Sequence, residues 1–285
     1  MRRHATILFL CGALVGMGVP SATAALAATR ITGAAVVKPT GYSIVSATFP
    51  LPNGFQTAGS VACPIKKGVQ TVPFSGGALV DTTSADASIS SSFPLPDGWA
   101  VDVNNTTGAA SDFSVYAVCA NKPEAYVQKE STTPVLADSF AQTGFGCPKG
   151  DVLLGGGARS GSSSPLVSLN SSYPESTTSW SLGLNNPTSS SLTMSHFQVC
   201  AKLNVAKISY EIVAPPGTDD PPGQLVETEA LCPGGRSVLG GGINATGSLG
   251  ISINSTLPLH GAWAGDESNA STVDATVATV VLCAF

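Results

Sequence analysis

The sequence predicts an all-β protein made of three tandem, disulfide-closed modules of about 84 residues each. The first observation is composition: 31 glycines and 20 prolines occur in 285 residues, and only 11% of the residues are charged. This composition argues against helical bundles and coiled coils. The second is a pattern of tyrosine, cysteine and tryptophan that recurs three times, and the third is the alternation of apolar and polar residues typical of half-buried strands. A single pseudo-threefold β-prism is the alternative arrangement.

Residues 1–27 have the pattern of a secretory signal peptide. Arg2 and Arg3 precede an apolar segment, residues 7–19, and small residues follow at 22–24 and 25–27 where cleavage is expected. The apolar segment is short for a bilayer crossing and no second one follows, so we expect no membrane span. The segment therefore predicts a secreted, extracellular protein.

The rest of the chain divides into β modules at residues 31–120, 121–203 and 204–285. Each module carries the same features in the same order. These are a leading tyrosine, a Cys-Pro pair, a glycine cluster, a serine shortly before a proline, one tryptophan and a closing Cys-Ala pair. The recurring residues are Tyr42, Tyr126 and Tyr210; Cys63, Cys147 and Cys232; Trp99, Trp180 and Trp263; and Cys119, Cys200 and Cys283. A period of this length suits a compact module of four to six short strands.

Residues 99–104 and 180–185 alternate between apolar and polar side chains, which predicts a half-buried strand that ends in a turn at an asparagine. The third copy differs, because Glu267 occupies the place of Val103 and Leu184. We therefore expect this strand to be shorter or exposed at an edge in the third module. The glycine clusters lack the strand–glycine–helix context of a phosphate-binding loop, so they are interpreted as sites of a β-bulge or close strand crossing.

Six of the seven cysteines lie beyond the signal segment, an even number that predicts three disulfides in a secreted chain. Symmetry of the modules leaves two pairing schemes. The scheme within modules joins Cys63–Cys119, Cys147–Cys200 and Cys232–Cys283; the scheme between modules joins Cys119–Cys147, Cys200–Cys232 and Cys63–Cys283. The first is favoured because it closes every module independently, with a stabilisation of roughly 4 kcal/mol per loop from chain entropy. Whether the modules are separate beads or one threefold body stays open.

The order Cys-Pro-x-Gly, Leu-Gly-Gly-Gly, Ser-Tyr-Pro, Trp and Val-Cys-Ala, clearest between Cys147 and Ala201, resembles a repeat of uncharacterised secreted proteins of actinobacteria. The first module departs from it at residues 65–68 and the third lacks the aromatic residue before its proline. The resemblance implies secretion and a β-rich disulfide module, and it brings no catalytic residues. The β-prism of egg vitelline-membrane outer-layer proteins is similar in its threefold plan, although its units are shorter.

Two classes of partner are not expected. The formal net charge is −5 and the 13 lysines and arginines are scattered, so no basic face for nucleic acid is predicted. No Cys-x-x-Cys pair exists and the cysteines are far apart, so no metal site is predicted. Nor is a cofactor.

Aromatic residues are the candidates for weak ligand binding. Trp99, Trp180 and Trp263 could stack on sugar rings, one in each module. The favoured interpretation is that they form the core, because each begins an alternating strand. Phe93 and Tyr173, in the segment before each tryptophan, are expected to be more exposed.

Catalysis has weaker support. A serine nucleophile needs a base, and the two histidines beyond the signal, His196 and His260, do not recur between modules. His196 is expected on the same strand face as Cys200, and His260 in a solvated turn. Paired carboxylates could serve a glycosidase, but they also do not recur, and residues 219–223 are interpreted as a solvated loop. These pairs are Asp266 with Glu267, Asp219 with Asp220, and Glu227 with Glu229.

The leading hypothesis is a non-enzymatic, secreted binding or surface-associated protein, with a cell-wall or extracellular polysaccharide as partner. Three like modules would bind with avidity. A self-associating coat or matrix protein is the alternative. A secreted hydrolase that uses one divergent module and a protease inhibitor are further alternatives.

Overall fold

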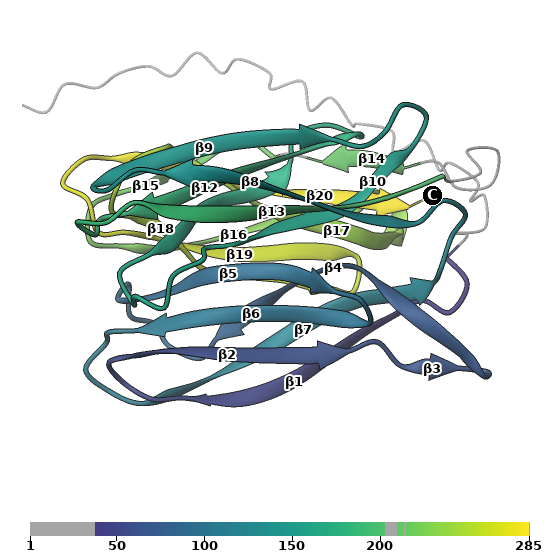
Figure 1. Ribbon diagram of the computed structural model, residues 1–285, viewed down its shortest axis with the longest axis horizontal. Helices are drawn as coiled ribbons and strands as arrows, with labels where there is room; N and C mark the ends of the chain where they lie inside the picture. Colours follow the sequence, from purple (N-terminus) through teal and green to yellow (C-terminus); the bar gives the residue numbers. More distant parts are fainter. Residues whose placement is uncertain (1–37, 203–209, 214, 285) are drawn as a thin grey trace, which may run out of the picture. The chain divides into compact units, whose positions relative to one another are not determined.

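A computed structural model describes residues 38–202, 210–213 and 215–284 of the chain. The predicted signal segment lies outside the described residues. The described residues form twenty β-strands and one short 3₁₀ turn, Pro233–Gly235. The all-β prediction is therefore confirmed (Figure 1).

The strands form three antiparallel sheets, and two modules contribute to each sheet. We name the sheets by these modules. In order, sheet 1/3 contains β1 (Ser43–Leu51), β7 (Ser111–Asn121), β4 (Val69–Val80), β18 (Ile251–Leu259), β19 (Ala262–Asn269) and β16 (Leu225–Leu231), with β3 (Ile65–Lys66) paired to β4. Sheet 1/2 contains β2 (Phe55–Ala62), β6 (Gly98–Asn105), β5 (Ala87–Leu95), β10 (Val152–Arg159), β13 (Leu192–Ala201) and β8 (Val127–Val135). Sheet 2/3 contains β14 (Tyr210–Val213), β20 (Ala275–Ala284), β17 (Ser237–Ala245), β11 (Ser168–Pro174), β12 (Ser179–Asn186) and β9 (Ser139–Gly146), with β15 (Thr218–Asp220) paired to β20.

Each module is closed by its own disulfide, as the favoured scheme predicts. The bonds join Cys63–Cys119, Cys147–Cys200 and Cys232–Cys283. The closing cysteines Cys119, Cys200 and Cys283 are fully buried. Three disulfides of this kind are typical of proteins in an oxidising environment.

The modules also share their sheets. At the junctions Ala78 pairs with Thr256, Ser92 with Ala158, and Ser172 with Ile243. The modules are therefore not separate domains, although each has its own disulfide. Every module continues into both of the others through backbone pairing, as a single pseudo-threefold body requires.

The glycine clusters lie at these junctions. A β-carbon at Gly77, Gly157 or Gly242 would collide with a backbone carbonyl of the neighbouring module. A register shift also occurs in each of the three strands that carry the clusters, β4, β10 and β17. The predicted close approach of strands at the glycines is confirmed, whereas the bulges fall just before the glycines, at Phe74, Leu154 and Leu239.

Buried asparagines and one half-buried tyrosine also connect the modules. The hydroxyl of Tyr126 in module 2 donates to the carbonyl of Pro73 in module 1 at 2.7 Å. Burial raises the pKa of Tyr126 to about 12. Side-chain amides donate across each junction, from Asn104 to the Val167 carbonyl at 2.8 Å, from Asn185 to the Ile251 carbonyl at 2.6 Å, and from Asn254 to the Ala87 carbonyl at 2.9 Å. These bonds satisfy buried carbonyls that the sheets leave unpaired.

The strand predicted to be short or edge-exposed in module 3 is neither. Strand β19 has eight residues, as do β6 and β12, and it lies between β18 and β16. Glu267 is completely buried. The expectation was wrong because it assumed that a carboxyl group must reach water. Asp220, placed in a solvated loop by the sequence, is also completely buried, in β15.

Candidate functional site

The three tryptophans are core residues. Their exposed fractions are 0% for Trp99, 2% for Trp180 and 0% for Trp263, so no ring face is available to a sugar. Each indole nitrogen donates to a hydroxyl on the preceding strand, on Ser92, Ser172 or Thr256, at 2.9, 3.1 and 2.7 Å. The core interpretation is thus supported, and stacking of a ligand on these rings is excluded.

The same bonds explain the serine before the proline in each module. The hydroxyl group two residues before Pro94, Pro174 or Pro258 holds the buried indole of its own module. In module 3 the corresponding residue is Thr256, and not the serine that precedes it, Ser255. The hydroxyl of Ser255 instead accepts from the backbone of Val80 in module 1.

Phe93 and Tyr173 are half-buried on the sheet face opposite the tryptophans. The ring of Phe93 is stacked on the ring of Phe197, with 5.5 Å between centroids and 24° between planes. Phe93 belongs to module 1 and Phe197 to module 2. They come together across β10, where Gly157 pairs with Phe197 and Ala158 pairs with Ser92.

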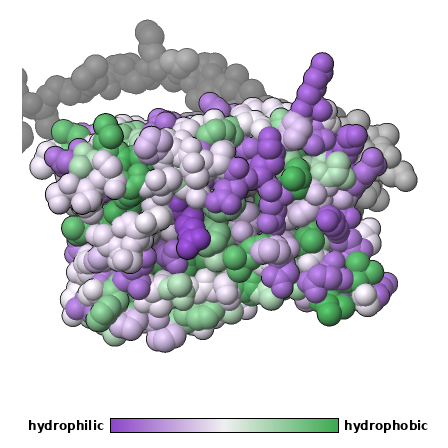
Figure 2. Space-filling view, viewed as in Figure 1, coloured by the Kyte–Doolittle hydropathy of each residue, from purple (hydrophilic) through white to green (hydrophobic). Residues whose placement is uncertain are grey.

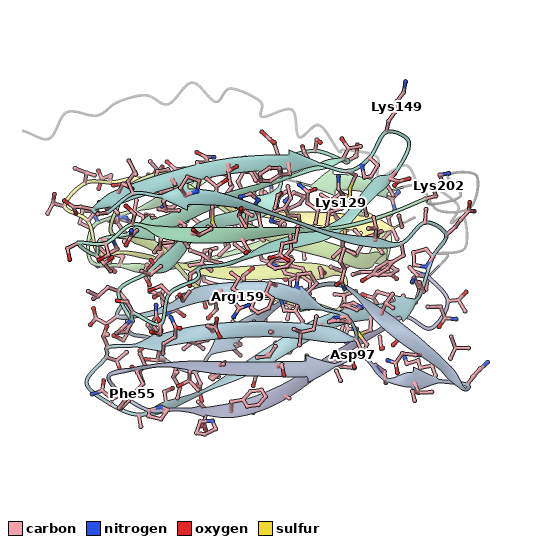
Figure 3. All side chains as sticks on the ribbon, in the orientation of Figure 1. Phe55, Asp97, Lys129, Lys149, Arg159 and Lys202 are labelled. Carbon is pink, nitrogen blue, oxygen red and sulfur yellow. A yellow bond between two sulfur atoms is a disulfide. The ribbon has the colours of Figure 1, made fainter. Side chains whose placement is uncertain are left out.

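A charged pair completes this group. The guanidinium of Arg159 lies over the Phe93 ring at 5.7 Å from its centroid, and Arg159 is exposed. Figure 3 shows Arg159 beside β5, where modules 1 and 2 meet. Asp102 on β6 is within electrostatic range of Arg159. We call Phe93, Phe197, Arg159 and Asp102 the inter-module site.

The carboxyl of Asp102 is held in a mixed environment. Partial burial raises its pKa, while a hydrogen bond from Ser91 and the positive charge of Arg159 oppose the rise. One face of the sheet thus carries the apolar ring of Phe93, the N–H donors of the Arg159 guanidinium and the acceptor oxygens of the Asp102 carboxylate. Figure 2 shows the same face with hydrophobic and hydrophilic side chains side by side.

The corresponding positions at the other junctions carry different side chains. Tyr173 takes the place of Phe93 in sheet 2/3, with Asn244 in the place of Arg159 and Val280 in that of Phe197. In sheet 1/3 the places of Phe93, Arg159 and Phe197 are taken by Leu257, Leu79 and Tyr116. The aromatic–arginine combination is thus present at one of the three junctions.

A groove of about 690 Å³ crosses the junction in sheet 1/3. Leu79, Asp81 and Thr83 line it from module 1, and Glu227 and Asp266 line it from module 3. Burial raises the pKa of Asp266, and the charge of Glu227 raises it further. A smaller pocket of about 340 Å³ lies elsewhere, with Phe74, Leu239 and Pro123 in its wall.

The two histidines lie in different environments, one buried and one exposed. His196 is 2% exposed, stacks on Phe145 at 4.0 Å between centroids, and bonds through Nε2 to the Thr133 hydroxyl at 2.8 Å. Burial lowers its pKa to about 4. It lies on the face of Cys200, as expected, and within the core of module 2. His260 is exposed in the turn between β18 and β19.

Two of the three predicted carboxylate pairs are separated, one by the face of the sheet and the other by exposure. Asp266 and Glu267 are neighbours on β19 and point to opposite faces. Asp219 is exposed whereas Asp220 is buried, and Glu227 and Glu229 are both exposed on β16. Among the described residues, no three His, Cys, Asp or Glu side chains are grouped so that they could hold a metal ion.

Sequence reasoning found Phe93 but missed Phe197, Arg159 and Asp102. These residues lie on the neighbouring strands β6, β5, β10 and β13, and no spacing in the sequence indicates that these strands are adjacent. Placing the three modules under one another would have shown that Arg159 alone is charged at its position.

Compared with known proteins, the chain matches no protein family and no curated protein. In the described part of the chain, no helix has the length and apolarity that a bilayer crossing requires.

Proposed function

We propose that the protein is a secreted, non-enzymatic binding protein that holds a saccharide chain of a cell-wall or extracellular polysaccharide at the inter-module site. The observation that carries the proposal is the stacked Phe93–Phe197 pair beside Arg159 and Asp102 on an accessible sheet face. Sugar rings bind through apolar contact with aromatic rings and through hydrogen bonds from their hydroxyl groups.

The charges favour a neutral or weakly charged saccharide. Arg159 and Asp102 lie close enough to interact, so their charges partly cancel and both remain able to bond hydroxyl groups. Because the other two junctions lack this combination, the proposal assigns binding to one site and not to three equal sites.

The test is retention of the purified mature protein on insoluble chitin, cellulose and bacterial cell wall. We expect binding to at least one surface, and a loss of about tenfold or more in affinity for Phe93→Ala, Phe197→Ala and Arg159→Ala. Each truncation removes a contact of roughly 1–3 kcal/mol.

Phe55→Ala is the matched control, because Phe55 is 64% exposed and lies at the end of β2, away from Arg159 (Figure 3). Equal losses in the control and in the site variants would contradict the proposal. So would the absence of binding to all three surfaces, and sedimentation runs would then test the self-associating coat protein.

A further inference from the structure

Module 3 contains two buried carboxyl groups where the other modules have apolar side chains. Glu267 lies four residues after its tryptophan, as do Val103 and Leu184. Asp220 pairs with Ala275, eight residues before the closing cysteine, as Leu51 pairs with Ser111 and Val135 with Leu192. The pairs Leu51–Val103 and Val135–Leu184 are thus replaced together by Asp220–Glu267.

These two carboxyl groups are completely enclosed. Asp220 and Glu267 have exposed fractions of 0%, and none of their four carboxyl oxygens has a hydrogen-bond partner. Glu267 is within electrostatic range of Asp220. Unpaired ionised carboxylates are costly in such a place, so the groups must be neutralised.

No side chain on the surrounding strands can neutralise them. Strands β15, β16, β17, β18, β19 and β20 contain no lysine, arginine or histidine. Val226 and Ile253 flank Glu267 in the sheet, and Ala275 flanks Asp220. The remaining charged groups on these strands are carboxylates on the outer face or at the strand end, namely Asp219, Glu227, Glu229 and Asp266.

We propose that Asp220 and Glu267 form a proton-binding pair that makes module 3 a pH-sensitive element, stabilised when the pair is protonated and destabilised when it ionises. Protons are the chemistry that fits, because a hard divalent cation needs six or more oxygen ligands and the flanking residues are aliphatic. The proposal is independent of the saccharide site, which lies between modules 1 and 2.

The direction of the pH effect follows from the buried groups. Burial raises the pKa of Asp220 to about 6. Burial raises the pKa of Glu267 well above its usual range, and the charge of Asp220 raises it further. Because both values are higher in the folded state than in the unfolded chain, the stabilisation is full below about pH 4 and is lost as the pH rises through 6 and beyond.

The test compares thermal unfolding of the mature protein with that of Asp220→Val/Glu267→Leu, which introduces the side chains of module 2. From pH 4 to pH 8 we expect the melting temperature of the wild type to fall relative to that of the double variant. Contributions from other titrating groups are common to both proteins and cancel in the difference. A difference that stays constant over this range would overturn the proposal.

Glu229→Gln is the matched control, since Glu229 is an exposed carboxylate on β16. Its pH profile should run parallel to that of the wild type. A calcium or magnesium titration at pH 8 forms a further arm. If a cation raises the melting temperature of the wild type but not of the double variant, the pair binds a metal ion instead of protons. That result would overturn the proposal.

A measurement on the wild type avoids dependence on variant folding. The side-chain carboxyl carbon of Glu267, followed by NMR, should keep its protonated chemical shift at pH 6. Ionisation of Glu267 near pH 4.5, its ordinary value, would contradict the proposal.

Discussion

The indole nitrogen of Trp180 donates a hydrogen bond of 3.1 Å to the hydroxyl of Ser172 on the adjacent strand. Both groups are buried. The bond allows the largest side chain of module 2 to enter the core without leaving its one polar atom unpaired.

We therefore expect Ser172→Ala to lower the free energy of unfolding by about 1–3 kcal/mol, because the buried N–H of Trp180 would lose its acceptor. Urea unfolding followed by tryptophan fluorescence measures this. Ser172→Thr is the control, since module 3 uses Thr256 in the same role. Equal stability of the alanine variant and the wild type would show that the bond contributes nothing.

Gly157→Ala should destabilise the protein by about 1–3 kcal/mol or prevent folding, because the added methyl group would collide with the Ser92 carbonyl at a module junction. Gly144→Ala is the control: its added carbon would lie 3.5 Å from the nearest atoms, an ordinary contact. The yield and melting temperature of the two variants decide the prediction, and similar values for both would refute it.

His196 should make module 2 less stable in acid. Burial lowers the pKa of His196 from 6.5 to about 4, so the folded state favours the neutral form of the imidazole ring. The stabilisation is present above pH 6.5 and is lost as the pH falls through 4. His196→Val, which introduces the side chain of Val115 in module 1, should remove this acid sensitivity. Melting temperatures from pH 7 to pH 4 test it, and parallel curves would count against the assignment.

Removal of one disulfide should be strongly destabilising. Cys147 and Cys200 are separated by 53 residues, so replacing both by alanine releases a loop whose closure contributes about 4 kcal/mol by chain-entropy arguments. Guanidinium unfolding of this variant should show a midpoint well below that of the wild type. An unchanged midpoint would contradict the prediction, because it would mean that closure of this loop contributes nothing to stability.

The features that recur in the sequence could be predicted, because each recurring residue performs one structural task in every module. Cysteines close the modules, glycines permit the junctions and tryptophans fill the cores. Symmetry reduced the disulfide pairings to two schemes, and the one that closes every module independently is the one that forms. The sharing of sheets could not be predicted, because the edge pairing of β5 with β10 involves one backbone pair and leaves no side-chain pattern.

The features specific to one module were harder to predict. Glu267 was visible as an exception, but Asp220 was not matched to Leu51 and Val135, because it lies ten residues after its tyrosine and they lie nine after theirs. The inter-module site combines residues of two modules. Taken singly in the sequence, Phe197, Arg159 and Asp102 do not differ from ordinary surface residues.

The pairing of β4 with β18 joins the first module to the last. A stack of repeats in which each unit touches only the units before and after it can grow by duplication, and it needs special end units. Here the third module pairs back to the first, so the three modules close on one another and none of them is an end unit. A fourth module would have to break the β4–β18 pairing, and loss of one would leave two unprotected sheet edges open to other chains.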